Sequence, residues 1–499
     1  MARRNRGVRV PSHARLVLIC FAIAANALCA GGVYSFPLIS PALVTHMKLT
    51  QPQLTTIALA GMVGQYPFAA FVGKLLDRYG PRACSLLSAV FFSMGFGFFS
   101  LEIAHTPDTI EKPSSASFRR LTVCFCLAGL ATVLSYFSFV FSATKAFPHY
   151  MGVASGTSMA IFGFSPLLLS ALATRYFTVP ETGLNVTRFL AFLAILSGVV
   201  HFISALCMQG SDHATRAPDV TSIEDPEPSS SSAGTVPTIV ENIGDSETRP
   251  LLVNKKPSSD LDIPIFSVPE PLHGSVADLL KDPYFWILTL VVATVLGTAE
   301  TVMANLGSIF VSLPAKSGAD ISTQVQLLSA SNTLSRLIVG PLADFVSPVA
   351  SYLHSGIWSF PRKQHVSRIA FLTGAASVSA LTFLWLVLTV RTQAGMWFLS
   401  VGVGIVYGTT FTILPGILSS IWGLPNLGRN FGIISYAPFF GTTFFSYIYA
   451  FVADHHTSPS ETACKGVECW QTTFWFSTMI TLVAACGSGV LWRRWKGRV

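Results

Sequence analysis

Apolar runs of about 20 residues or more, separated by short polar segments, recur from residue 16 to residue 492. A helix of about 20 residues crosses the hydrocarbon core of a bilayer, which is roughly 30 Å thick. The pattern therefore predicts twelve transmembrane helices in two groups of six. The first group covers 16–38, 54–76, 82–101, 120–143, 150–173 and 188–208. The second group covers 284–311, 324–346, 367–389, 394–417, 430–452 and 471–492.

A polar segment separates the two groups. It contains an acidic, proline-rich stretch at 224–228 and consecutive serines at 229–232. Such a segment buries too little apolar surface to fold alone, so we expect a disordered linker. At its end, Asp282 suits the N-cap and Pro283 the first turn of the next helix. The predicted organisation is a basic N-terminus at 1–15, a six-helix half at 16–208, the linker at 209–283, a second six-helix half at 284–492 and a C-terminus at 493–499.

Composition supports a membrane protein. Hydrophobic residues make up 51% of the chain and charged residues 11%, whereas soluble domains carry about 25% charged residues. The net charge of +8 does not indicate nucleic-acid binding, because the basic residues are spread between the apolar runs. The nine cysteines show no metal-ligand spacing, and we find no phosphate-binding loop or nucleophile elbow. We expect an all-α membrane protein in contact with the lipid bilayer, with neither a metal nor a cofactor, and no enzymatic activity.

The distribution of Lys and Arg predicts the orientation of the chain. Cytosolic loops carry an excess of these residues. Placing the N-terminus in the cytosol assigns most of the 32 basic residues to that side. Both termini and the linker are therefore expected in the cytosol.

A charged loop between the second and third spans carries a specific pattern. Its fixed positions are Gly73, Asp77, Arg78, Gly80 and Arg82. Together they resemble the loop signature G-x-x-x-D-R/K-x-G-x-R of the major facilitator transporters. A glycine at the first position permits close helix approach, and one at the fourth permits a turn with positive φ. The aspartate can pair with basic residues or with a helix N-terminus. The resemblance implies a cluster that holds the cytosolic helix ends together and releases them during transport.

The second half repeats part of this pattern. Gly340 and Asp344 end the eighth span as Gly73 and Asp77 end the second. A parallel repeat of two six-helix halves is how major facilitator transporters are built, and their substrate site lies between the halves near the membrane midplane. The resemblance therefore implies this fold and secondary transport of a small molecule.

Arg336 is the most informative single residue, because it lies deep within the eighth span. A charge at that depth costs at least ~2.5 kcal/mol, so it should face a cavity or a partner. Glu300 in the seventh span lies at a similar depth and is the expected partner. One interpretation is an arginine that binds an anion beside a carboxylate that carries a coupled proton. The other interpretation is a structural ion pair.

Span one contains Gly31, Gly32 and Pro37, which predict a kinked helix with backbone exposed to a cavity. With Arg336, this run resembles the monocarboxylate-transporter branch, and within it the fungal homologues with nodulin-like features. The resemblance implies a small organic anion, monocarboxylate-like, as substrate. Animal carriers of this branch have a lysine where this chain has Leu38 and an aspartate where it has Asn332. Lactate transport is therefore not implied.

Other polar side chains complete the candidate site. We expect Asn332, Asn26, Tyr34 and Asn305 to contact substrate, although each asparagine could instead bond a neighbouring helix. Two other functions stay open. One is transport of a neutral or cationic solute, with Arg336 and Glu300 as a structural pair. The other is a membrane sensor that does not transport.

Two features lie outside the predicted spans. Glu247, Leu251 and Leu252 form the acidic dileucine pattern E-x-x-x-L-L in the linker, which a cytosolic sorting adaptor can read. This pattern and the fungal resemblance favour the vacuolar membrane, with the plasma membrane as the alternative. Cys464 and Cys469 lie in the last non-cytosolic loop, where an oxidising compartment would allow a disulfide.

Overall fold

The computed structural model describes residues 13–107, 114–147, 151–179, 183–208, 276–315, 320–347, 351–352, 358–359, 366–422, 427–458 and 463–495. The chain divides into two compact units. One unit combines Met1–Asp212 with Pro271–Val499, and it contains every described residue. The other unit, His213–Glu270, lies outside the described residues, as do the predicted sorting residues Glu247, Leu251 and Leu252.

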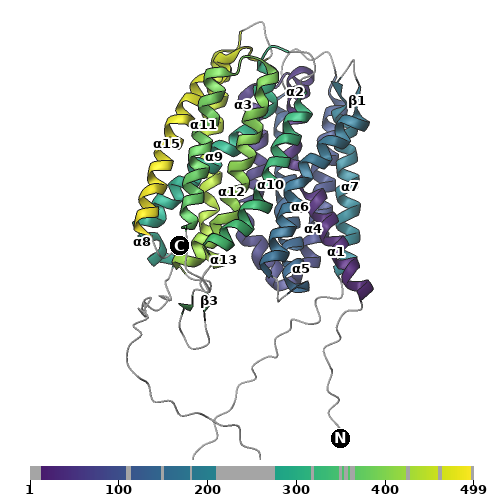
Figure 1. The fold of residues 1–499 in the computed structure, drawn as a ribbon. Helices are drawn as coiled ribbons and strands as arrows, with labels where there is room; N and C mark the ends of the chain where they lie inside the picture. Colours follow the sequence, from purple (N-terminus) through teal and green to yellow (C-terminus); the bar gives the residue numbers. More distant parts are fainter. Residues whose placement is uncertain are drawn as a thin grey trace, which may run out of the picture. The chain divides into compact units, whose positions relative to one another are not determined.

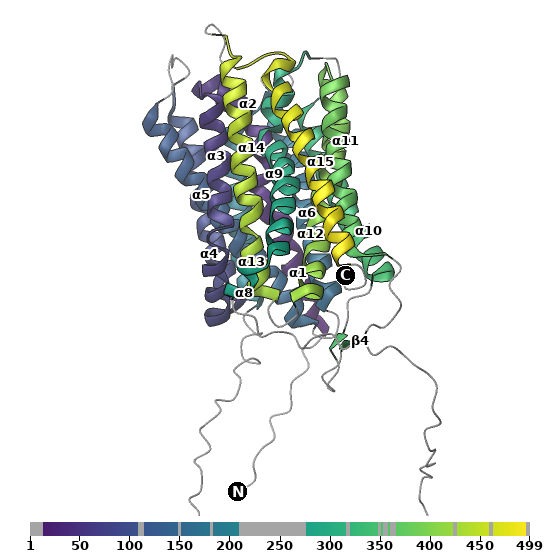
Figure 2. The ribbon, with the colours of Figure 1, turned by 90° about the vertical axis from the view of Figure 1, so that its left-hand side faces the viewer.

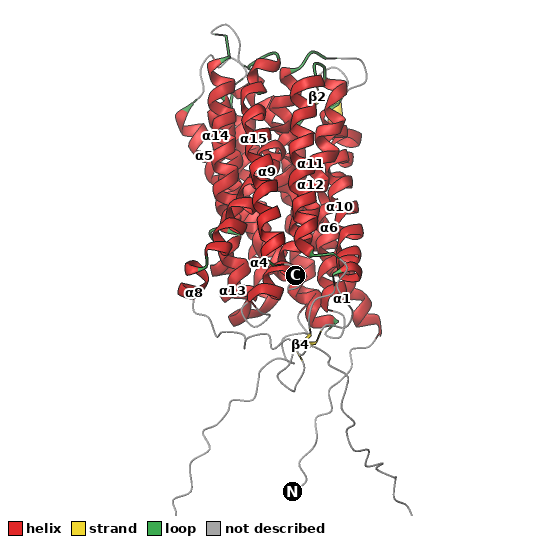
Figure 3. Cartoon of the chain, turned by 60° about the vertical axis from the view of Figure 1, so that its left-hand side comes forward, coloured by secondary structure: helices red, strands yellow, loops and turns green. Residues whose placement is uncertain are grey.

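The described part is almost entirely helical (Figure 3). The first half contains α1 (His13–Cys29), η1 (Ala30–Ser35), α2 (Phe36–Met47), α3 (Gln51–Gln65), α4 (Ala69–His105), α5 (Ser115–Ala146), α6 (Met151–Leu172), η3 (Ala173–Phe177) and α7 (Val186–Cys207). The second half contains α8 (Val276–Lys281), α9 (Pro283–Ser312), α10 (Ile321–Val346), α11 (Arg368–Thr389), η6 (Gln393–Met396), α12 (Trp397–Trp422), α13 (Leu427–Ile434), α14 (Tyr436–His455), η8 (Val467–Cys469) and α15 (Gln471–Arg494). Two short antiparallel ribbons pair β1 (Thr178–Val179) with β2 (Gly183–Leu184) and β3 (Ser351–Tyr352) with β4 (Trp358–Ser359).

Nine helical segments of the described chain are long and apolar enough to cross a membrane. The other three predicted spans are also helical: α3 with the start of α4, then α10, then α13 with α14. Polar residues lower the hydropathy of α10, which carries Gln324, Asn332 and Arg336. Span eight is therefore a helix whose polar side chains need partners inside the bundle.

Span one is longer than predicted. The helix breaks into the 3-10 segment η1, where Gly31 has non-helical angles (φ −84°, ψ 15°). Pro37 then stands in the first turn of α2, a position where its missing N–H leaves no hydrogen bond unmade. The chain therefore restarts as a helix to Met47, and the predicted end at residue 38 is wrong.

Two further breaks follow from residue chemistry. Gly80 has φ 77° and ψ 175°, an angle pair open mainly to glycine, and it divides the long helix α4 at the predicted loop between spans two and three. Span eleven divides at Ser435 into α13 and α14. Pro438 cannot donate a backbone hydrogen bond to the preceding turn, which accounts for this break.

The predicted linker ends earlier than expected. Its last part folds as α8 (Val276–Lys281), so the expected disorder up to residue 283 is wrong there. Asp282 caps α9, as predicted, by accepting a hydrogen bond from the backbone N–H of Tyr284 at 2.9 Å. Its second oxygen accepts a bond from the Trp422 indole at 3.3 Å, which ties the start of α9 to the end of α12.

The start of α1 and the end of α15 lie at the same end of the bundle (Figures 1 and 2). We call this end the terminal side and the opposite end the far side. The two halves meet where α6 packs on α10, α2 on α9 and α3 on α14. Large apolar side chains such as Phe21, Ile195 and Phe451 are exposed on the outside of the bundle, as a surface in contact with lipid requires.

Candidate functional site

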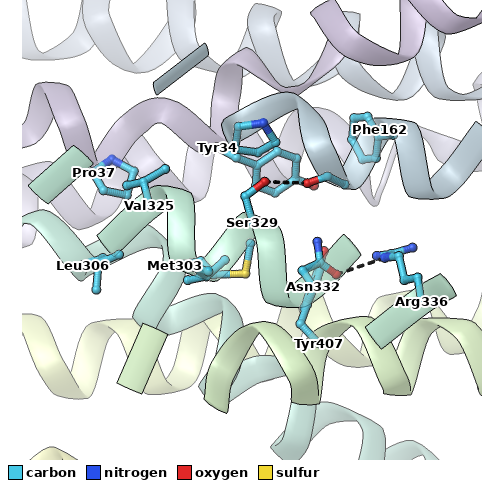
Figure 4. A pocket seen from close by; sticks show the side chains of 13 residues that line it. Tyr34, Pro37, Phe162, Met303, Leu306, Val325, Ser329, Asn332, Arg336 and Tyr407 are labelled. Atoms are coloured by element: carbon cyan, nitrogen blue, oxygen red, sulfur yellow. Dashed lines mark hydrogen bonds between the residues drawn. The ribbon is translucent and has the colours of Figure 1, made fainter. Parts of the chain in front are cut away.

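A cavity between the halves holds the sequence-predicted arginine (Figure 4). It contains about 480 Å³ that protein atoms do not fill, including space that is open to the surroundings. Helix α10 supplies its polar wall, and η1, α2, α6, α9 and α12 supply the rest. Its lining residues are Tyr34, Pro37, Phe162, Gly163, Pro166, Met303, Leu306, Val325, Leu328, Ser329, Asn332, Arg336 and Tyr407. Among these residues the positive charge of Arg336 stands in a mostly aromatic and aliphatic wall.

Arg336 has few partners of its own. Its Nε donates a hydrogen bond to Oδ1 of Asn332 at 3.0 Å, one helical turn away. Its guanidinium carbon lies 5.8 Å from the ring centroids of both Tyr407 and Phe411, within the range of cation–π attraction. None of these contacts neutralises the charge. The two Nη nitrogens of the guanidinium have no hydrogen-bond acceptor in the described part of the chain, so they can donate to an incoming oxygen.

A second cavity, of about 420 Å³, adjoins the first. Tyr34, Pro37 and Met303 line both cavities. The second cavity also contains Glu300 and Gln65, and the Tyr34 hydroxyl donates to Oε1 of Gln65 at 3.3 Å. Tyr34 therefore stands at the boundary between the arginine and the carboxylate.

The predicted pair between Arg336 and Glu300 does not form among the described residues. Glu300 is 1% exposed and accepts hydrogen bonds from the Tyr66 hydroxyl at 2.5 Å and from Thr442 Oγ1 at 2.7 Å. The sequence places both charges at one depth but does not say which way each side chain points around its helix. Helix α9 turns Glu300 toward α3 and α14, and α10 turns Arg336 toward α12.

Sequence reasoning missed Tyr66, Tyr407 and Thr442, which surround these charges. Each is a polar side chain inside an apolar run, and the sequence alone shows this feature. The runs contain many such residues, however, and only packing selects the ones that face a cavity.

Two predicted contact residues lie elsewhere. Asn26 is fully buried and donates to Ser85 Oγ at 3.2 Å, and it lines neither cavity. Asn305 accepts from Gln51 Nε2 at 3.0 Å and from Thr55 Oγ1 at 3.1 Å, so it joins α9 to α3. Both placements correct the prediction of a substrate contact, because each amide instead bonds a neighbouring helix.

The loop signature lies on the terminal side, around Gly80 of α4. Arg78 is exposed, and its guanidinium carbon lies 5.5 Å from the centroid of the Tyr79 ring. Nε of Arg82 is buried without a hydrogen-bond partner among the described residues. A Cβ at Gly73 would meet Phe137 at an ordinary 3.7 Å, so the described helices do not approach each other closely at this glycine in this structure. The side chain of Asp77 lies outside the described residues.

The corresponding position of the second half has a defined ion pair. Asp344 Oδ1 lies 2.6 Å from Nη2 of Arg368, and Nε of Arg368 donates to the Ser347 carbonyl at 3.0 Å. Arg368 is buried at the start of α11, whereas Asp344 is largely exposed at the end of α10. The sequence did not identify Arg368.

On the far side, Cys464 and Cys469 are joined by a disulfide, with a Cα–Cα distance of 5.8 Å.

A helical bundle of two halves, with an apolar exterior and polar side chains gathered in cavities between the halves, defines a membrane transporter. The family model described as Major Facilitator Superfamily matches residues 19–437. The chain belongs to this superfamily, whose members are transporters and not enzymes.

Curated relatives cover nearly the whole chain. "Probable transporter MCH1" of Gibberella zeae is 28% identical, and the match covers 95% of this chain and 89% of that protein. The protein of the same name in Candida albicans is 27% identical, with 95% and 91% covered. The one in Saccharomyces cerevisiae is 23% identical, with 95% and 92% covered.

Solved structures share the fold. The inward-open xylose transporter XylE from E. coli superposes with a TM-score of 0.60 at 11% identity, covering 95% of this chain and 96% of that chain. A point mutant of the nucleoside transporter NupG gives a TM-score of 0.59 at 11% identity, covering 96% and 99%. The protein is thus an all-α transporter of the major facilitator fold.

Proposed function

We propose that the protein is a secondary transporter of a small organic anion, monocarboxylate-like, that works by alternating access. The observation that carries the proposal is Arg336, which lines the cavity between the halves without an acidic partner among the described residues. A guanidinium offers paired donors that match a carboxylate. The aromatic and aliphatic wall around it suits an apolar body of the solute, because burial of that surface is favourable.

The separation of the two charges bears on the alternative. If Arg336 and Glu300 served only as a structural ion pair, the solute could be neutral or cationic. The absence of that pair from the described hydrogen bonds favours an anion at Arg336. Glu300 then remains available as the group that carries a coupled proton, held apart from the anion by Tyr34. Asn332 and Tyr34 would contribute polar contacts to the solute.

Uptake into proteoliposomes tests the proposal. We expect wild-type protein to take up at least one radiolabelled monocarboxylate from a panel of mono- and dicarboxylates, and uptake should respond to an imposed pH gradient. Sugars and organic cations of similar size serve as controls. Uptake of a control solute without uptake of any anion would contradict the assignment.

The proton role has its own variant. In Glu300→Gln, uptake driven by the concentration gradient of the anion should persist. The change in uptake caused by the pH gradient should disappear. A pH response equal to that of wild type would exclude Glu300 as the proton carrier.

We also propose the vacuolar membrane as the location, with both termini in the cytosol. The supporting observations are the excess of Lys and Arg on the terminal side and the dileucine pattern at Glu247, Leu251 and Leu252. A sorting adaptor can read that pattern only from the cytosol. The terminal side would then be cytosolic and the far side luminal.

Double replacement of Leu251 and Leu252 by Ala should move a fluorescently tagged protein from the vacuolar to the plasma membrane. The pattern cannot bind an adaptor once both leucine side chains are removed. Leu261→Ala, elsewhere in the same segment, is the matched control. An unchanged vacuolar distribution in the double variant would rule out this signal.

A further inference from the structure

The hydrogen bonds between the two halves share one property. They lie between the middle of the bundle and the far side, where α3 meets α9 and α14 and where α6 meets α10. Among the described residues, the bonds between these helices are Gln51–Asn305, Thr55–Asn305, Thr56–Tyr447, Tyr66–Glu300, Leu167–Ser329, Ser329–Gly163 and Ser170–Ser322. A further hydrogen bond joins Tyr34 of η1 to Tyr407 of α12. The structure is therefore closed toward the far side, and these bonds must break when it opens there.

Only one bond in this set involves a carboxylate. Tyr66 follows the last residue of α3 in the first half, and Glu300 lies on α9 in the second half. The Tyr66 hydroxyl donates to Oε1 of Glu300 at 2.5 Å. Thr442 donates to Oε2 at 2.7 Å, but Thr442 belongs to the second half and moves with Glu300. Tyr407 on α12, also in the second half, is a third hydrogen-bond partner of Glu300. Separation of the halves would thus remove Tyr66 from Glu300, whereas Thr442 and Tyr407 would move with it.

The surroundings make Glu300 dependent on those donors. The carboxyl is buried, and no ion pair to it occurs in the described part of the chain. The titratable groups that face it in the described part of the chain are tyrosines: Tyr66 directly after α3, Tyr407 from α12 and Tyr34 from η1. The nearby positive charge, Arg336 on α10, contacts the Tyr407 ring. A buried carboxylate without a cation is stable only while hydrogen bonds replace its lost hydration.

We propose that Tyr66 couples the protonation of Glu300 to opening of the far side. Hydroxyl bonds to an ionised carboxylate are short and about twice as strong as bonds between neutral groups. The ionised form therefore holds Tyr66 and keeps the far side closed. Protonation turns the contact into a neutral hydrogen bond and removes the need for a second donor, so the form open to the far side becomes more populated. Tyr66 acts through Glu300 as a positioning residue.

This inference rests on the proposed alternating access but not on the identity of the solute. In the vacuolar membrane the far side would face an acidic lumen. Acid on that side would then favour the state that opens to it. Proton binding and solute entry would occur in the same state, which is the basis of coupling.

The experiment measures the distance across the far side as a function of pH. Spin labels on cysteines introduced at His105 of α4 and Asp454 of α14, both exposed, report on the first and second half. Pulsed EPR is recorded on full-length protein in nanodiscs, without substrate, at pH 5 and pH 8. We expect the population with the longer distance to rise several-fold at pH 5 in the wild-type background.

Three variants define the outcome. At both pH values, Glu300→Gln should show the distance distribution that wild-type protein shows at pH 5, because an amide carries no charge. Tyr66→Phe should be open at both pH values, because the bond between the halves is gone. Thr442→Val is the matched control: it removes a donor within one half, and its distance should still change with pH.

A wild-type pH response in Tyr66→Phe or in Glu300→Gln would overturn the proposal and assign the response to other groups, such as His455 at the end of α14. Absence of any response in wild-type protein would overturn it as well. The measurement uses no solute, so a failure of anion uptake would contradict the proposed function and leave this result standing.

Discussion

Arg336→Gln should abolish uptake of the transported anion. The substitution keeps a hydrogen-bonding side chain, although a shorter one, and removes the charge that the described residues place in the wall of the arginine cavity. Loss of one partner of a buried, charged hydrogen-bonded pair costs about 2 kcal/mol or more, which corresponds to a fall in uptake efficiency of about 30-fold or more. Initial rates over a range of anion concentrations in proteoliposomes measure this effect.

Two comparisons make the result specific to the cavity. Arg336→Lys keeps the charge and loses the forked pair of donors, so it should retain part of the uptake. Arg391→Gln removes an exposed arginine whose described hydrogen bonds reach only backbone carbonyls at the end of α11, and it should transport as wild type does. Uptake by Arg336→Gln at the wild-type rate would remove the stated mechanism.

Gly307→Ala should stop transport for a different reason, because it prevents closure of the far side. Gly307 of α9 lies against α2, where an added Cβ would overlap the carbonyl oxygen of Pro37 and the hydroxyl of Ser40. A backbone atom cannot move aside as a flexible side chain can. The two halves would have to stay apart, so we expect a protein that folds but remains open to the far side.

The distance between spin labels at His105 and Asp454 reports this state directly. In Gly307→Ala it should be long at every pH, and solute uptake should fall at least tenfold because the cycle cannot complete. Gly374→Ala in α11 is the control, since a Cβ there meets nothing within 4 Å. A short distance in Gly307→Ala would show that the helices can adjust.

Some features could be predicted from local sequence because they depend on depth in the membrane or on local chemistry. Apolar runs gave the positions of the spans, and the isolated charge at Arg336 indicated a cavity. Asp282 and Pro283 gave the start of α9, because capping involves only residues close in the chain. Gly80 was predicted to turn with positive φ, as it does.

Other features required the tertiary structure, because hydropathy defines how deep a residue lies but not which way it points around its helix. Rotation about the helix axis is set by packing against neighbours. Packing joins Glu300 to Tyr66 and Thr442 and not to Arg336. It also buries Asn26 against Ser85, away from both cavities. The sequence by itself determined a membrane transporter with charge in its interior, and only the packed helices decided which partners meet those charges.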